Sequence, residues 1–165
     1  MLTTQWKKTA ATLCAATLLI AATGITMAQE HSHSHGHEEQ ARLALDNGKK
    51  WATDDNLRQS MSRIRDALAV EPTAIHSGKA TAGQYRALAQ KTNDQIAFMV
   101  KNCKLEQKAD AMLHLVLADI IAGADAMMAP DGNKARNGAE KIAAALDNYG
   151  TYFDHPGWHG IKPGH

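Results

Sequence analysis

The sequence predicts an all-α protein: an antiparallel up-down-up-down four-helix bundle that follows a disordered, histidine-rich N-terminal tail. Apolar residues recur three and four residues apart through four long stretches, which is the spacing of one face of a helix. The stretches are joined by short connections, and short connections between long helices imply antiparallel neighbours. Since no stretch alternates apolar and polar residues convincingly, we expect no sheet.

Residues 1–28 have the features of a secretory signal peptide. Lys7 and Lys8 give a positive start, residues 9–22 form a short apolar run, and small residues precede a cleavage point after Ala28. The run is shorter than the roughly 20 apolar residues of a membrane span. We therefore expect export to the periplasm, with no membrane attachment after cleavage. An uncleaved N-terminal anchor is the alternative.

The composition of the mature chain limits its partners and its means of stabilisation. Loss of Lys7 and Lys8 lowers the basic count from 18 to 16 against 17 acidic residues, a net charge of −1. A nearly neutral chain offers no electrostatic basis for binding nucleic acid or an anionic membrane. Only Cys103 follows the predicted cleavage point, so no internal disulfide is expected and an apolar core must hold the fold.

Residues 29–53 are expected to form a histidine-rich tail and a capping segment. The tail alternates histidine with serine and glycine and has no apolar anchor, so we expect it to be disordered without a ligand. Neutral imidazole is a good ligand for copper, nickel and zinc, and alternate histidines of a flexible chain can converge on one ion. A solvated tail without a specific role is the alternative. The candidate metal ligands are His31, His33, His35, His37, His155, His159 and His165.

The capping segment contains a turn signal, Asp46-Asn47-Gly48. We expect its apolar residues to lie across the open end of the bundle. These are Leu43, Leu45 and Trp51. The first helix is expected from Asp54, with Thr53 as its N-cap, to about Val70. Its core face carries Leu57, Met61, Ile64 and Leu68.

Three further helices complete the predicted bundle, which spans residues 54–155. They are expected at residues 81–103, with Thr81 as N-cap, at residues 106–128, and from the turn at 130–132 to a point before Pro156. A tail rich in glycine, proline and histidine, residues 156–165, follows. The predicted core residues of the second helix are Tyr85, Leu88, Ala89, Thr92, Ile96, Met99, Val100 and Cys103. Those of the third helix are Ala109, Met112, Leu113, Val116, Ile120, Ala124 and Met127. Those of the fourth are Ala139, Ile142, Ala143, Leu146, Tyr149 and Phe153.

The helix count places the C-terminus beside the start of the first helix. The N-terminal tract and the C-terminal histidines are therefore hypothesised to share one metal site. Met99 and Cys103 lie four residues apart on one helix face. The alternatives for these two residues are a thioether–thiolate ligand pair for Cu(I) and ordinary packing in the core. Lys101 and Lys104 would lower the pKa of an exposed Cys103, which leaves a reactive thiol as a further alternative.

Residues 57–68, Leu-Arg-Gln-Ser-Met-Ser-Arg-Ile-Arg-Asp-Ala-Leu, resemble the first helix of cytochrome b562, a periplasmic four-helix bundle. The resemblance implies the bundle fold. It also implies a haem held by a methionine at the position of Met61 and by a histidine near the end of the last helix, here His155. His155 departs from the family pattern, because it comes one position late relative to Leu146 and precedes Pro156.

The sequence contains no nucleophile elbow, phosphate loop, zinc-protease helix or paired-carboxylate constellation, so we do not expect an enzyme. The Glu-x-x-His pair of the carboxylate-bundle metal proteins is missing too, because residue 111, three before His114, is alanine. The favoured function is periplasmic binding of a transition metal for sequestration or transfer. The alternatives are a haem-binding electron-transfer bundle, and a helical adaptor that binds a periplasmic protein partner.

Overall fold

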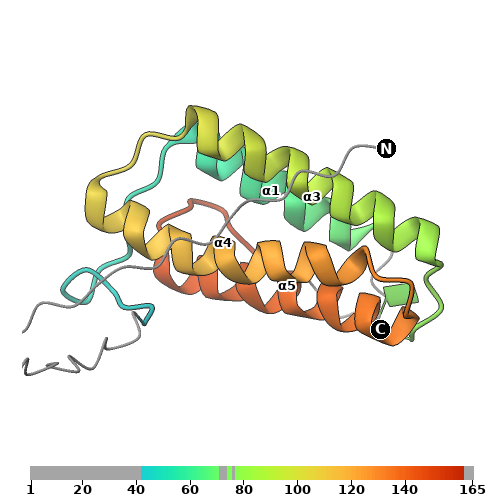
Figure 1. Cartoon of the computed structure of the whole chain (residues 1–165). Coiled ribbons are helices and arrows are strands. Elements are labelled where there is room, and N and C mark those ends of the chain that lie inside the picture. Colours follow the sequence, from blue (N-terminus) through green and yellow to red (C-terminus); the bar gives the residue numbers. More distant parts are fainter. Residues whose placement is uncertain (1–41, 71–73, 76, 162–165) are drawn as a thin grey trace, which may run out of the picture. The chain divides into compact units, whose positions relative to one another are not determined.

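The computed structural model describes residues 42–70, 74–75 and 77–161 (Figure 1). Four long helices make up most of this part of the chain: α1 (Asp55–Ala69), α3 (Ala82–Asn102), α4 (Gln107–Met127) and α5 (Gly132–Tyr152). The prediction of an all-α protein with four helices is confirmed. Within the described ranges, β-type pairing is limited to two isolated bridges, Asp46 with Lys49 and Trp51 with Phe153.

Each helix is preceded by an N-cap residue whose side chain accepts backbone hydrogen bonds from the first turn. Thr81 and Gln84 form the capping box of α3, which confirms the predicted N-cap. The predicted N-cap of α1 is wrong, because Asp54 and not Thr53 accepts the Leu57 N–H, at 2.7 Å. The Thr53 hydroxyl instead donates to the carbonyl of Asp154, 2.5 Å away. The remaining caps are Glu106 and Asp131.

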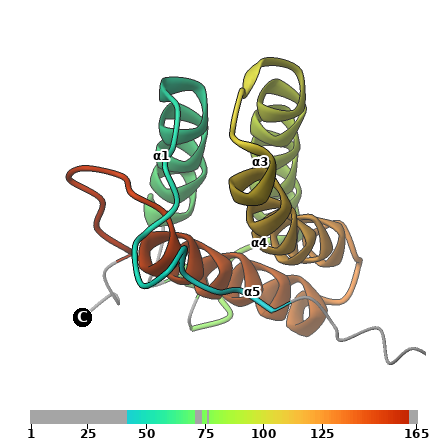
Figure 2. The same cartoon turned by 90° about the vertical axis from the view of Figure 1, so that its left-hand side faces the viewer.

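The helices pack as neighbouring pairs, and the most extensive contact joins α4 and α5. Figure 2 shows α1 and α3 side by side above α5. Small residues allow α4 and α5 to approach closely. A Cβ added at Gly138 would lie 2.5 Å from the carbonyl oxygen of Gly123, and one added at Gly123 would lie 2.6 Å from that of Gly138. The backbones therefore touch at this crossing, which any larger residue would obstruct.

The predicted core is confirmed on α1, where all four apolar stripe residues are buried. One prediction on α3 is wrong: Val100 is 78% exposed. It follows the buried Met99, and one residue turns a helical side chain by about 100°, here into solvent. Several predicted core residues are half-buried against the core: Leu88, Ile96, Cys103 and Met112. The core also includes small or apolar residues that were not predicted: Ile75, Leu117, Ala135 and Ala145.

The capping segment lies against the end of α5. Asn47 and Gly48 adopt left-handed backbone conformations, with φ of 49° and 83°, in the turn bridged by Asp46 and Lys49. Trp51 N–H donates to the Tyr152 carbonyl and Asp154 N–H donates to the Trp51 carbonyl, both at 2.8 Å. Leu43 and Trp51 pack on the core as expected, whereas Leu45 is 40% exposed and does not.

After α5 the chain folds back along the same helix, and residues 154–161 are called the C-terminal strap here. The Trp158 indole lies over Gly150, where a Cβ would be 2.5 Å from its Cδ1 atom. Gly160 lies against the Asp147 carboxylate in the same way, with a Cβ–Oδ1 distance of 2.6 Å. The strap is irregular, as predicted for this tail, yet its Trp158 and Ile161 pack on the core. In the described part of the chain, we find no helix that is both long enough and apolar enough for a membrane span.

Candidate functional site

A surface pocket of about 440 Å³ lies where the start of α1 meets the C-terminal strap. One wall comes from α1 and the residues before it, and the other comes from the first residues of the strap. The lining residues are Ala52, Thr53, Arg58, Gln59, Ser62, Asp154, His155 and Pro156. The pocket therefore exists only because residues about 100 positions apart in the chain are held together.

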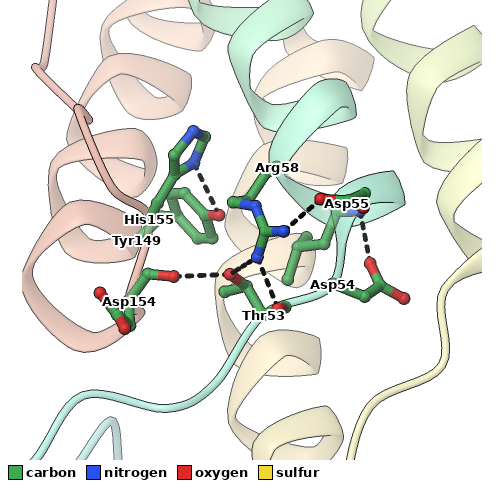
Figure 3. A network of polar contacts seen from close by, with 8 residues as sticks. Thr53, Asp54, Asp55, Arg58, Tyr149, Asp154 and His155 are labelled. Carbon is green, nitrogen blue, oxygen red and sulfur yellow. Dashed lines mark hydrogen bonds and ion pairs between the residues drawn. The ribbon is translucent and has the colours of Figure 1, made fainter.

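Arg58 connects the two sides of this pocket (Figure 3). Its Nη1 donates to the Thr53 carbonyl at 2.6 Å and to the Thr53 hydroxyl at 2.9 Å. The same hydroxyl donates to the Asp154 carbonyl, and Arg58 Nη2 forms an ion pair with Asp55. The Arg58 side chain is 30% exposed, so it remains accessible from the pocket while it orders the backbone around it.

His155 lies on the strap side of the pocket and contacts the rings of Tyr149 and Trp158. Its Nδ1 lies 3.0 Å from the Tyr149 hydroxyl oxygen, and its ring centroid lies 4.9 Å from that of Trp158. Burial lowers the pKa of His155, and the positive charges of Arg58 and Arg65 lower it further, against an opposing effect of Asp154. His155 is therefore a neutral imidazole at neutral pH.

Tyr149 keeps its proton for a similar reason. Burial raises the pKa of its hydroxyl far above the ordinary value of a tyrosine, so the group can donate to His155 Nδ1. In that tautomer His155 presents its other ring nitrogen, Nε2, as an N–H group. Arg65 lies over the Trp158 ring of the strap, with its guanidinium 5.1 Å from the ring centre. The same guanidinium donates a hydrogen bond to Asp66.

The predicted metal ligands fall in two groups. His31, His33, His35, His37 and His165 lie outside the described residues, and so does the hypothesised site shared by the two ends of the chain. His155 and His159 are both in the strap, where His159 is exposed with its Nδ1 3.2 Å from the Gly157 carbonyl. Within the described ranges, no three histidine, cysteine, aspartate or glutamate side chains gather into a group that would hold a metal ion.

The two residues of the haem hypothesis do not line the same pocket. Met61 is fully buried in the core cluster, whereas His155 faces the pocket beside Arg58 and Ser62. The haem hypothesis for Met61 and His155 stays a prediction.

Cys103 does not have the lowered pKa of a reactive thiol. Burial raises the pKa of Cys103 to about 11, and the Asp54 carboxylate contributes through its charge and a hydrogen bond. The interpretation based on Lys101 and Lys104 is wrong because burial is the largest influence on the Cys103 pKa and the charged groups that act on it are Asp54 and Asp110. His114 is an exposed residue of α4 whose Nδ1 contacts the Asp110 carbonyl at 2.8 Å.

Sequence reasoning missed Arg58, Gln59 and Ser62 as site residues. All three lie on α1 outside its buried stripe, where polar residues normally face solvent. The signal that could have found them was Trp158 in a tail of glycine and proline, since a large aromatic residue there needs a surface to pack on. Comparisons with protein-family models, curated proteins and solved structures find no match for this chain.

Proposed function

We propose that this protein is a periplasmic transition-metal-binding protein that sequesters or transfers copper, nickel or zinc through its histidine-rich tract. The observation that carries the proposal is the tract itself: four imidazoles within residues 31–37, separated only by serine and glycine. Imidazole suits each of these metals, and small polar spacers let several rings reach one ion. The ligands proposed are His31, His33, His35 and His37.

In this proposal the bundle is the rigid scaffold that carries the tract. Its four helices are antiparallel, in up-down-up-down order. Two sets of contacts support that order. The Lys104 N–H donates to Asp54 at 2.6 Å, which puts the end of α3 beside the start of α1. The hydrogen bonds of Trp51 with Tyr152 and Asp154 put the end of α5 beside the start of α1. Helices joined by short connections with these ends together alternate in direction.

The surroundings of the strap histidines favour His159 over His155 as an additional ligand. Arg58 and Arg65 act on His155 with positive charge, which disfavours a cation there. His159 is exposed, and its Nδ1 contact with the Gly157 carbonyl leaves Nε2 as the ring nitrogen for a metal. A metal-ligating histidine commonly donates its other ring N–H to a backbone carbonyl in this way.

Titration of the purified protein with copper, nickel and zinc salts at about pH 7.5 and about pH 5.5 tests the proposal. Affinity should fall at the lower pH, because a protonated imidazole cannot ligate. Replacement of the four tract histidines by serine should abolish the tightest binding. His114→Ser on α4 is the matched control and should leave it unchanged. Equal affinity at both pH values, or full binding by the tract variant, would overturn the proposal.

A further inference from the structure

We propose a second site, separate from the metal ligands: the pocket between α1 and the C-terminal strap binds a small organic carboxylate. Arg58, Gln59 and Ser62 are its recognition residues. Ser62 lies four positions after Arg58 and three after Gln59 along α1, and all three residues line the pocket. The proposal goes beyond metal binding and does not depend on it.

Several side chains that line the pocket can donate hydrogen bonds. The side chains of Gln59 and Ser62 line the pocket, and within the described part of the chain neither has a hydrogen-bond partner. Beside them lies the Arg58 guanidinium, whose Nη1 donates to Thr53 and whose Nη2 is paired with the exposed Asp55, so a ligand carboxylate would take the place of Asp55. His155 adds an N–H group in the tautomer that accepts from Tyr149. These groups together form a concave surface that offers donors to an anion.

Two positive groups, Arg58 and Arg65, act on His155 against one negative group, Asp154. Three carboxylates lie nearby, and one of them belongs to Asp154, which lines the pocket. Asp55, the ion-pair partner of Arg58, has a side chain that is 97% exposed, so the pair is weak and replaceable. Asp66 is occupied by Arg65. The exposed Asp154 carboxylate points away from Arg58 in Figure 3, and only its backbone carbonyl takes part in the network.

Part of the remaining wall of the pocket is apolar. Ala52 and Pro156 line the pocket with apolar surface. The hydrocarbon part of an organic anion can pack against this surface, whereas inorganic phosphate has no such part. The volume of about 440 Å³ is within the range of small-molecule sites, roughly 300–1,000 Å³. A ligand with a carboxylate at one end and a short apolar body therefore fits better than an inorganic oxyanion.

The test is amide NMR of the whole purified protein, with a chelator present, titrated with butyrate, with butyramide and with inorganic phosphate. Butyrate should cause saturable shifts at Arg58, Ser62 and His155, with a Kd near about 1 mM. Butyramide has the same shape without the charge and should bind at least about tenfold more weakly. Ser62→Glu, which puts a negative charge in the pocket, should weaken butyrate binding by a similar factor.

Arg63→Gln is the matched control, because Arg63 is exposed on α1 and does not line the pocket. It removes one positive charge from the same helix and should leave butyrate binding unchanged. Gln59→Ala, at an exposed position, is the second variant should Ser62→Glu unfold, and it should weaken binding about threefold or more. The absence of a saturable shift, equal binding of butyramide, or equal binding of phosphate would overturn the assignment. Loss of binding in Arg63→Gln would attribute the effect to general charge and would also overturn it.

Discussion

The close approach of α4 and α5 makes Gly138 the most informative single position for the fold. In Gly138→Ala the new methyl would lie 2.5 Å from the Gly123 carbonyl oxygen and 2.8 Å from the Ala126 Cβ, whereas ordinary contact begins at 3.4 Å. The obstructing oxygen belongs to a helix backbone and cannot rotate away. The two helices must therefore separate locally by about 0.9 Å, the difference between 3.4 and 2.5 Å.

The expected cost follows from two opposing effects. Overfilling a packed interface costs about 1–3 kcal/mol, and an obstruction by backbone atoms places this case near the upper value. Alanine in place of glycine in a helix interior contributes about 1 kcal/mol of stabilisation. We therefore expect the free energy of unfolding to fall by about 2 kcal/mol. For a folded part of this size the melting temperature should fall by about 8 °C.

Urea unfolding followed by far-UV circular dichroism measures this change. Gly132→Ala is the matched control, because Gly132 is the first residue of α5 and a Cβ there meets nothing within 4 Å. That variant should be as stable as the original chain or gain up to about 1 kcal/mol. If Gly138→Ala were as stable as Gly132→Ala, the helices would not approach as closely as described, and the reasoning would be refuted.

Three further predictions concern the ends of the bundle. Asp54→Ala should lower the free energy of unfolding by about 2 kcal/mol, because it removes the cap of Leu57 and the acceptor of Lys104 N–H. An effect below about 0.5 kcal/mol in urea unfolding would contradict this. Iodoacetamide should modify native Cys103 much more slowly than the urea-unfolded chain at neutral pH, because its pKa is raised to about 11; equal rates would count against it. His155 has a pKa lower in the folded state than its free value of 6.5, so protonation favours unfolding. Stability should fall as pH drops below about 6.5, and His155→Gln should flatten that dependence; an unchanged pH profile would refute it.

The helices could be predicted from the sequence because each repeats its signal many times. On α1, four apolar residues at helical spacing all reach the core, so one misplaced residue would not have changed the prediction. Val100 shows where apolar spacing fails as a predictor of burial. The buried face of α3 is narrower than its apolar residues suggest, and Val100 lies outside it. The N-cap of α1 shows another: Thr53 and Asp54 both favour that position, and their contacts with Asp154 and Lys104 decide between them.

The pocket could not be predicted, because it depends on contacts between distant parts of the chain. Trp158 packs over Gly150, and Thr53 donates to Asp154; neither pair shares a periodic pattern in the sequence. The small residues at the α4–α5 crossing were also hard to foresee. Helix propensity alone marks Gly138 as a residue that weakens a helix. Its role is to leave room for the backbone of Gly123 on the neighbouring helix.

The proposed function requires the histidine tract to be a transition-metal ligand in the cell. Measurement of the metal content and visible absorption spectrum of protein isolated from its native envelope tests this most directly. We expect copper, nickel or zinc in stoichiometric amount, its loss when His31, His33, His35 and His37 are replaced by serine, and no haem bands. Metal-free protein, metal retained by that variant, or a haem spectrum would contradict the account.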